Sequence, residues 1–114
     1  MQGIKDAAKM KEVALGKEYD LSFAFVGPKE MRRINNERRG KDYATDILSF
    51  ELDKNAGEIL ICKSAARKKA KEFGRTPENY LRFLFIHGLM HLKGMDHGAT
   101  MEASERKLRK QFGV

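Results

Sequence analysis

Apolar residues recur along this chain at two different spacings, and the changes from one spacing to the other predict where helices and strands lie. In segment 6–17 the apolar positions fall three and four residues apart, which predicts a short amphipathic helix. Residues 21–26 form a phenylalanine-rich run that stops at Gly27 and Pro28, as strands commonly do. Pro28 also favours the first turn of a second helix, which we expect to end before Gly40.

Two further apolar runs predict a β-hairpin. They cover 47–52 and 58–62, and the residues between them include Asp, Asn and Gly. Because these residue types favour tight turns, we expect the two runs to pair as antiparallel strands. The sheet therefore has at least three strands.

The second half of the chain predicts three helices. Ser64 is a good N-cap for a helix over 65–73, and Thr76 is a good N-cap for the next helix. That helix is apolar at nearly every position from 80 to 92. It therefore lacks a broad solvent face and is expected to be the central helix. A last amphipathic helix is predicted over 100–112.

Length and composition indicate one soluble domain over 1–114. A chain of 114 residues with 41% hydrophobic and 34% charged residues can form one compact core. No apolar run is long enough to span a bilayer, and the first residues lack a secretory pattern. A single cysteine, Cys62, cannot form an intramolecular disulfide. We therefore expect a cytoplasmic monomer that does not associate with membranes.

The charge balance favours a polyanionic partner. Lysine and arginine number 23 against 16 acidic residues, which gives a net charge of +7. Such an excess is typical of nucleic-acid-binding proteins, although it also serves solubility alone.

All three histidines fall within eleven residues, and this clustering is the strongest chemical signal. His87 and His91 are four apart on the predicted central helix, so their rings project from one face. Gly94 can break the helix and let His97 reach the same point. Three nitrogens with an open fourth position are typical of a catalytic zinc site. The alternative is three unrelated histidines, which would leave two polar rings on a buried helix at ~1 to 3 kcal/mol each.

Ligand chemistry favours one zinc ion per chain, because neutral imidazole is a suitable ligand for Zn²⁺. Nickel and copper remain alternative metals, because imidazole binds them as well. Gly88 stands where zinc proteases of the His-Glu-x-x-His type carry their general base, which weakens a peptidase reading. Cys62 either closes the site as a fourth ligand, which would make the zinc structural, or is a small core residue.

Three sequence blocks resemble one known family, the YbeY-type endoribonucleases, which are bacterial rRNA maturation factors. The family pattern His-Gly-x-x-His-Leu-x-Gly-x-Asp-His is met at His87, Gly88, His91, Leu92, Gly94, Asp96 and His97. Residues 34–51 resemble a second block of the family pattern, and residues 57–61 resemble a third block, Gly-Asp-Ile-x-Ile. The chain departs from the family where Ala44 and Glu51 replace proline and where Glu58 replaces aspartate.

The resemblance implies an α+β fold, with a small mixed sheet of about four strands packed with about five helices. The central helix would carry the metal-binding histidines. The implied activity is a metal-dependent, single-strand-capable endoribonuclease in ribosomal RNA maturation, including 16S rRNA processing, and in ribosome quality control. Its partners would be ribosomal RNA or ribosomal subunits.

The resemblance also assigns roles to individual residues. Arg39 matches the family's functional arginine and is expected to act in catalysis together with His87. A guanidinium can donate two hydrogen bonds to a phosphate, although Arg39 can also be an ordinary surface residue. With Arg38 and Lys41 it would bind nucleic acid.

Other polar residues within or beside the family blocks each have two possible roles. Asp96 would orient a ligand imidazole or simply form a turn. Thr45, Asp46 and Ser49 would line the cleft, although Thr-Asp before a strand is also common turn chemistry.

Two other functions stay open from the residues alone. One is a metallohydrolase acting on a peptide or small molecule, and the other is a non-enzymatic, ribosome-associated zinc module. For the ribonuclease, the residues leave the nucleophile open between a metal-bound hydroxide and a 2′-hydroxyl. They also leave the general base unidentified.

Overall fold

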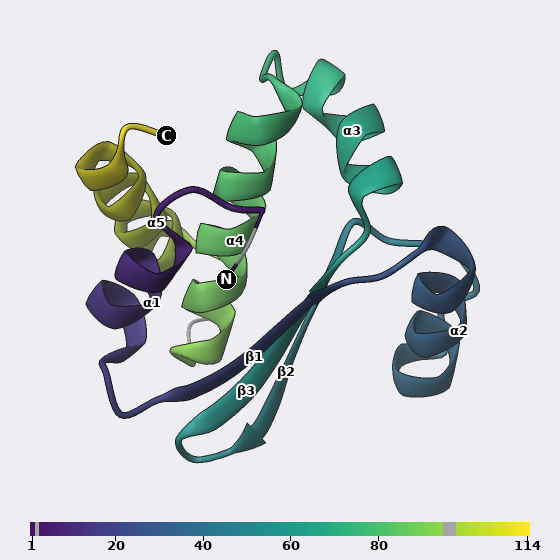
Figure 1. The fold of residues 1–114 in the computed structure, drawn as a ribbon, viewed down its shortest axis with the longest axis horizontal. Coiled ribbons are helices and arrows are strands. Elements are labelled where there is room, and N and C mark those ends of the chain that lie inside the picture. Colours follow the sequence, from purple (N-terminus) through teal and green to yellow (C-terminus); the bar gives the residue numbers. More distant parts are fainter. Residues whose placement is uncertain (2, 95–97) are drawn as a thin grey trace.

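The computed structural model describes residues 1, 3–94 and 98–114. Within these ranges the chain forms five helices and three strands (Figure 1). In chain order they are α1 (Ala7–Leu15), β1 (Asp20–Phe25), α2 (Pro28–Arg39), β2 (Ile47–Asp53), β3 (Ala56–Ile61), α3 (Lys63–Glu72), α4 (Pro77–Leu92) and α5 (Ala99–Phe112). The predicted α+β class and helix number are confirmed. No helix in these ranges has the length and apolar character needed to cross a membrane.

The sheet is small and mixed, with the strand order β1-β3-β2. β2 and β3 pair antiparallel, as the hairpin prediction requires, and β1 runs parallel to β3. The expectation of about four strands was wrong, since the described residues form three. The chain ahead of β1 forms α1, and the connection between α2 and β2 contains no strand.

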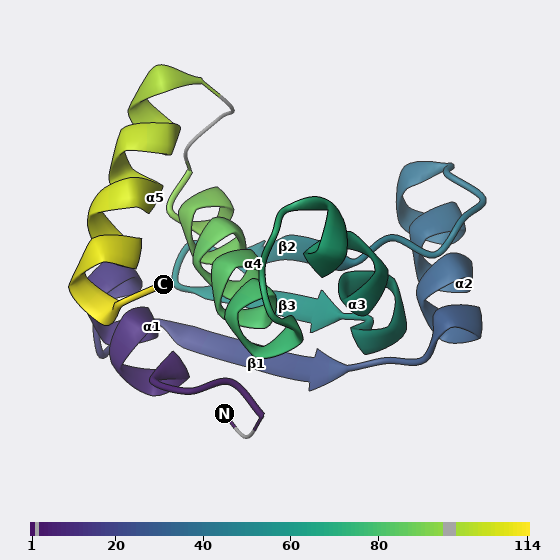
Figure 2. The same cartoon turned by 90° about the horizontal axis from the view of Figure 1, so that it is seen from above.

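The two faces of the sheet are covered by different helices. Ile59 and Ile61 of β3 belong to the larger core, which includes α1, α3, α4 and α5. Leu60 points to the other face, where it packs in a smaller cluster with Met31 of α2 and Leu48 of β2. This division follows from the alternation of side chains along a strand. Figure 2 shows α2 at the opposite end of the sheet from α1 and α5.

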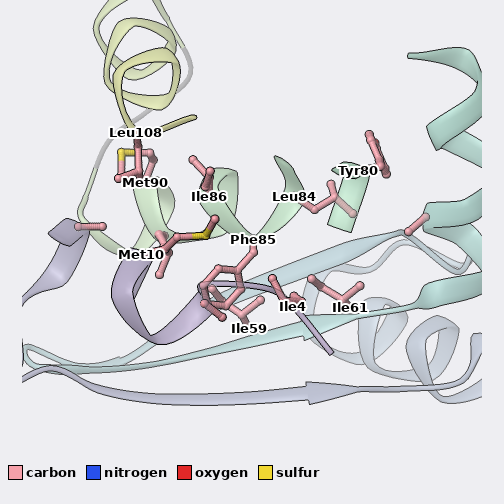
Figure 3. Close-up of a cluster of buried hydrophobic side chains, with 14 of the residues drawn as sticks. Ile4, Met10, Ile59, Ile61, Tyr80, Leu84, Phe85, Ile86, Met90 and Leu108 are labelled. Carbon is pink, nitrogen blue, oxygen red and sulfur yellow. The ribbon is translucent and has the colours of Figure 1, made fainter. Parts of the chain in front are cut away.

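Helix α4 is the centre of the larger core, as its apolar sequence predicts. Phe85, Ile86 and Leu89 have no exposed surface. Phe85 lies between Met10 of α1 and Ile59 of the sheet (Figure 3). Because packed neighbours surround it on several sides, α4 provides a fixed support for any group that it carries.

The two predicted helix caps had different outcomes. Thr76 caps α4 as predicted, because its hydroxyl accepts a hydrogen bond from the Asn79 amide at 3.1 Å. The prediction that Ser64 caps α3 was wrong. The N-cap is Cys62, since β3 continues almost directly into the helix and leaves Ser64 within its first turn.

Candidate metal centre

The last two turns of α4 bring two imidazole rings together. The Nε2 atoms of His87 and His91 lie 3.1 Å apart, and their ring centroids lie 4.6 Å apart. Two ligand nitrogens at about 2.0 to 2.1 Å from one tetrahedral ion are separated by about 3.3 Å. The spacing of these nitrogens therefore fits a shared metal ion, and the two rings lie on one face of α4, as their four-residue spacing predicts.

The predicted third ligand, His97, lies outside the described residues, and so does Asp96. Among residues 1, 3–94 and 98–114, no group of three His, Cys, Asp or Glu side chains could hold a metal ion. The described part of the site therefore consists of two converging imidazoles.

A carboxylate that the sequence analysis missed contacts the first of these histidines. Glu105 of α5 lies within hydrogen-bond distance of Nδ1 of His87, and its second oxygen is 3.7 Å from Nη1 of Arg109. Glu105 is only 7% exposed. A carboxylate on Nδ1 fixes the ring orientation and directs Nε2 toward a metal, as in many zinc sites.

One sequence signal could have identified Glu105. Glu105 lies on the same stripe of α5 as Met101 and Leu108, both of which are buried. A charged residue within the apolar stripe of an amphipathic helix needs a buried partner. Here that partner is His87, 18 positions earlier in the chain.

A cavity of about 260 Å³ adjoins His87. Its lining comes from the helix carrying the histidine pair, from Gly98 and from the first turns of α5: His87, Gly98, Met101, Glu102 and Glu105. The two acidic residues and the imidazole give this cavity a polar wall at which a water molecule or substrate can reach the ring.

Gly88 allows α4 to lie close to the sheet beside the histidine pair. A Cβ atom at this position would lie 2.9 Å from Oγ of Ser49 and 3.0 Å from Cδ1 of Ile47. The Ser49 hydroxyl donates to the Gly88 carbonyl oxygen at 3.5 Å. Ser49, predicted in the cleft, therefore lies at the contact between β2 and α4, on the backbone of the residue that follows His87.

Asp46 and Thr45, also predicted in the cleft, form hydrogen bonds near the other end of α4. The Tyr80 hydroxyl donates to Oδ2 of Asp46 at 3.0 Å, and Thr45 donates to Oδ1 at 3.4 Å. Burial raises the pKa of Tyr80 well above its usual value, and the adjacent Asp46 carboxylate raises it further. Both Asp46 and Tyr80 are buried, so this pair holds the start of β2 against α4.

The three residues predicted to bind nucleic acid lie on the far side of the sheet. Arg38 and Arg39 end α2, and Lys41 follows it, all three exposed. The Arg38 guanidinium carbon lies 4.7 Å from the Phe50 ring centroid. Because α2 packs on the sheet face opposite α4 (Figure 1), the structure does not bring Arg39 into contact with His87 or His91.

Cys62 is a core residue, which was one of its two predicted roles. It is fully buried with Met31, Leu48 and Leu60 in the cluster beneath α2. The thiol therefore lies on the other side of the sheet from the histidine pair and does not close the candidate site.

Known proteins resemble this chain over nearly its whole length. The sequence profile described as Endoribonuclease YbeY matches residues 1–113. The protein named Endoribonuclease YbeY in Alkaliphilus metalliredigens is 38% identical to this chain, and the match covers 83% of this chain and 68% of that protein. The one in Bdellovibrio bacteriovorus is 36% identical, over 100% of this chain and 76% of that protein.

The fold has a solved relative as well. A protein from Thermotoga maritima, known from its solution structure, is 28% identical and superposes with a TM-score of 0.70. The match covers 99% of this chain and 85% of that one. The histidine motif, the architecture and the match over residues 1–113 agree, and the chain belongs to the YbeY endoribonuclease family.

Proposed function

We propose that this chain is a zinc-dependent endoribonuclease that cleaves single-stranded RNA during ribosomal RNA maturation. The observation that carries the proposal is the 3.1 Å approach of the Nε2 atoms of His87 and His91. Membership of an endoribonuclease family supports the reaction class. The metal, the ribosomal substrate and the cytoplasmic location are our inference.

The side chains at this site fit zinc better than other common ions. Two neutral imidazoles are suitable ligands for Zn²⁺, whereas Mg²⁺ and Ca²⁺ prefer oxygen ligands. Because Glu105 contacts Nδ1 of His87, the Nε2 atom of that ring remains directed toward Nε2 of His91, where a metal ion would be held. We assign His97 as the third ligand from the sequence, with one ion per chain. Nickel and copper satisfy the same donor chemistry.

When bound, zinc would supply a Lewis acid for the phosphodiester and would lower the pKa of a coordinated water toward ~7. The protein's part is to hold His87 and His91 in a fixed orientation. Packing of α4 in the core and the Glu105 contact perform this task. Preorganised ligands avoid the cost of reorienting groups during the reaction.

The surface charge supports RNA as substrate. The chain carries a net charge of +7, and exposed basic residues gain affinity for phosphates by releasing counterions. Arg39 is exposed and can donate two hydrogen bonds to one phosphate. Its place at the end of α2 suits a role in binding RNA outside the histidine pair, with Arg38 and Lys41 beside it.

Metal analysis combined with an RNA cleavage assay tests the proposal. His91→Ala should lose both bound metal and cleavage, while Arg39→Ala should retain metal and lose most cleavage. Arg39→Lys is the matched control for charge, since it keeps the positive charge but not the two-pronged hydrogen bonding. Full metal content in His91→Ala would contradict the site, because the variant lacks one of the two converging nitrogens.

The reaction products identify the nucleophile. A 2′,3′-cyclic phosphate end would show that the substrate's own 2′-hydroxyl attacks, and a simple phosphate end would show that water attacks. Cleavage of a peptide but not of RNA by the purified chain would contradict the proposed substrate.

A further inference from the structure

Three aromatic side chains gather where α3 meets α4, and one of them is the Tyr80 that donates to Asp46. Phe73 follows the last turn of α3, and Tyr80 and Phe83 lie on α4. The ring centroids of Phe73 and Tyr80 are 5.5 Å apart at an interplanar angle of 24°, and those of Tyr80 and Phe83 are 5.6 Å apart at 17°. The centroids of Phe73 and Phe83 are 6.0 Å apart at 36°, so each ring contacts the other two. We call these three residues the aromatic strip.

Phe73 is the member of the aromatic strip that is most exposed to solvent. Phe73 is 55% exposed, more than any other large apolar side chain that the structure describes. It borders an open depression of about 470 Å³, lined by Phe73, Gly74, Arg75, Thr76 and Asn79. A large aromatic ring that is exposed beside a hollow has a face available for stacking.

Two guanidinium groups flank the aromatic strip. The Cζ atoms of Arg75 and Arg109 lie 4.5 Å and 5.1 Å from the centroid of the Phe83 ring. Burial and the nearby charge of Arg109 both lower the pKa of Arg75. Nη1 of Arg75 donates a hydrogen bond to Oδ1 of Asn79, which is a neutral amide. Arg109 shares its charge with Glu105 at 3.7 Å and its side chain is only 16% exposed, so Arg75 is the guanidinium that favours an added anion.

The aromatic strip continues the line of the histidine pair along α4. Phe83 precedes His87 by four residues and Tyr80 precedes it by seven, which are about one and two helical turns. Two turns correspond to about 10 Å, the length of about three stacked nucleotides of a single strand. Arg109 also approaches Glu105, the carboxylate at His87, to 3.7 Å.

We propose that the aromatic strip and its two arginines form a binding subsite for single-stranded RNA. A base stacks on the exposed ring of Phe73, and Arg75 binds the neighbouring phosphate, with the positive charge of Arg109 beside it. Stacking on exposed aromatic side chains combined with basic groups is how many proteins hold single strands. The inference rests on the proposed function, because it places this subsite beside the cleavage site.

The positive charge beside the aromatic strip favours RNA over a protein partner as its ligand. An aromatic cluster alone would suit either an apolar peptide or a nucleic-acid base. The two guanidinium groups at the same ring favour a ligand that carries both flat apolar groups and closely spaced negative charges. A single-stranded RNA has both features in every nucleotide.

Binding of two probes by the purified full chain tests the subsite. The probes are a fluorescent uridine dodecamer and a ribose-phosphate chain of equal length without bases, followed by anisotropy at low temperature. Phe73→Leu should weaken binding of the dodecamer about tenfold and leave the abasic chain unaffected. Arg75→Ala should weaken binding of both probes and make the dependence of affinity on salt less steep.

Control variants separate stacking from folding. Phe73→Tyr keeps an aromatic ring and should bind the dodecamer like the unmodified chain. Val13→Ala changes another exposed apolar residue, on α1, and should have no effect. Thermal melting checks that each variant is folded.

The possible failures are distinguishable. Equal binding of the dodecamer by the unmodified chain and Phe73→Leu would overturn the subsite while leaving the proposed ribonuclease intact. Tyr80, which contacts Phe73, lies about two helical turns from His87, and a dinucleotide at the histidine pair spans less than this, so both proteins should cleave it equally. If the unmodified chain cleaves neither substrate, the proposed function itself fails. A dimer that Phe73→Leu dissociates would also overturn the subsite, because a second copy would then occupy the strip.

Discussion

The two faces of the sheet carry chemically different groups. On the α4 face, His87 and His91 extend from a helix packed into the larger core, and the buried Glu105 contacts one of them. On the α2 face, Arg38, Arg39 and Lys41 are exposed. The α4 face therefore fixes the orientation of its polar groups, while the α2 face leaves its basic groups exposed to solvent.

This difference matches what each task needs. A metal site requires ligand atoms held within a few tenths of an ångström, so its residues depend on buried neighbours. Electrostatic attraction of a nucleic acid acts through water and tolerates loose side chains. Substitutions on the α4 face should therefore have large effects on metal binding, while those of Arg38 and Lys41 on the α2 face should leave the metal in place and change RNA affinity by a small, salt-dependent amount.

Apart from the histidines themselves, the largest effect is expected for the carboxylate that contacts His87. Glu105→Gln removes the negative charge that orients the imidazole, and we expect metal affinity and RNA cleavage to fall about 10- to 100-fold. Metal titration and a cleavage assay measure this loss. Glu102→Gln is the matched control, since Glu102 lines the same cavity but is exposed. Equal losses in the two variants would indicate a general charge effect.

A smaller effect is expected where α4 approaches the sheet. Gly88→Ala would bring a Cβ to 2.9 Å from Oγ of Ser49, and relieving that contact should cost about 1 to 3 kcal/mol of unfolding free energy. Chemical denaturation measures the change. Gly27→Ser also adds a Cβ, but nothing lies within 4 Å of it, so stability should hardly change. An unaffected Gly88→Ala would show that α4 can shift without loss.

The buried Tyr80–Asp46 hydrogen bond should make stability depend on alkaline pH. The pKa of Tyr80 is raised by folding, so its contribution is complete below the ordinary tyrosine pKa of about 10. It is lost as pH rises from there toward the folded pKa. Tyr80→Phe should lose about 1 kcal/mol or more at neutral pH and show a shallower alkaline decline. Denaturation between neutral and alkaline pH tests this, and identical declines would contradict it.

The smallest effect is expected on the α2 face. Lys41→Ala and Arg38→Ala should each weaken RNA binding a few-fold and reduce the slope of log affinity against log salt by about 0.7. Metal content should not change in either variant. Binding at several salt concentrations measures the slope. A loss of metal on substituting Lys41 would contradict the separation of the two faces.

Local patterns predicted much of this molecule from the sequence. The apolar run of α4, the turn residues of the hairpin and the four-residue spacing of His87 and His91 each act over a few neighbouring positions. Such signals depend on helix and strand geometry alone. The central helix, the antiparallel pair and the converging imidazoles followed from them.

Contacts between distant segments could not be predicted in the same way. Glu105 meets His87 across 18 positions, Tyr80 meets Asp46 across 34, and Ser49 meets Gly88 across 39. Each depends on how two elements pack in space. The fourth strand was expected from resemblance to a family, and the described chain forms the sheet without it.

Titration of the metal-free chain with Zn²⁺, followed by calorimetry, tests the central claim most directly. The unmodified chain should bind one ion with high affinity, and His97→Ala should bind it at least about 100-fold more weakly while melting as a folded protein. Equal affinity in the two proteins, or no zinc binding by the unmodified chain, would contradict a three-histidine metal centre.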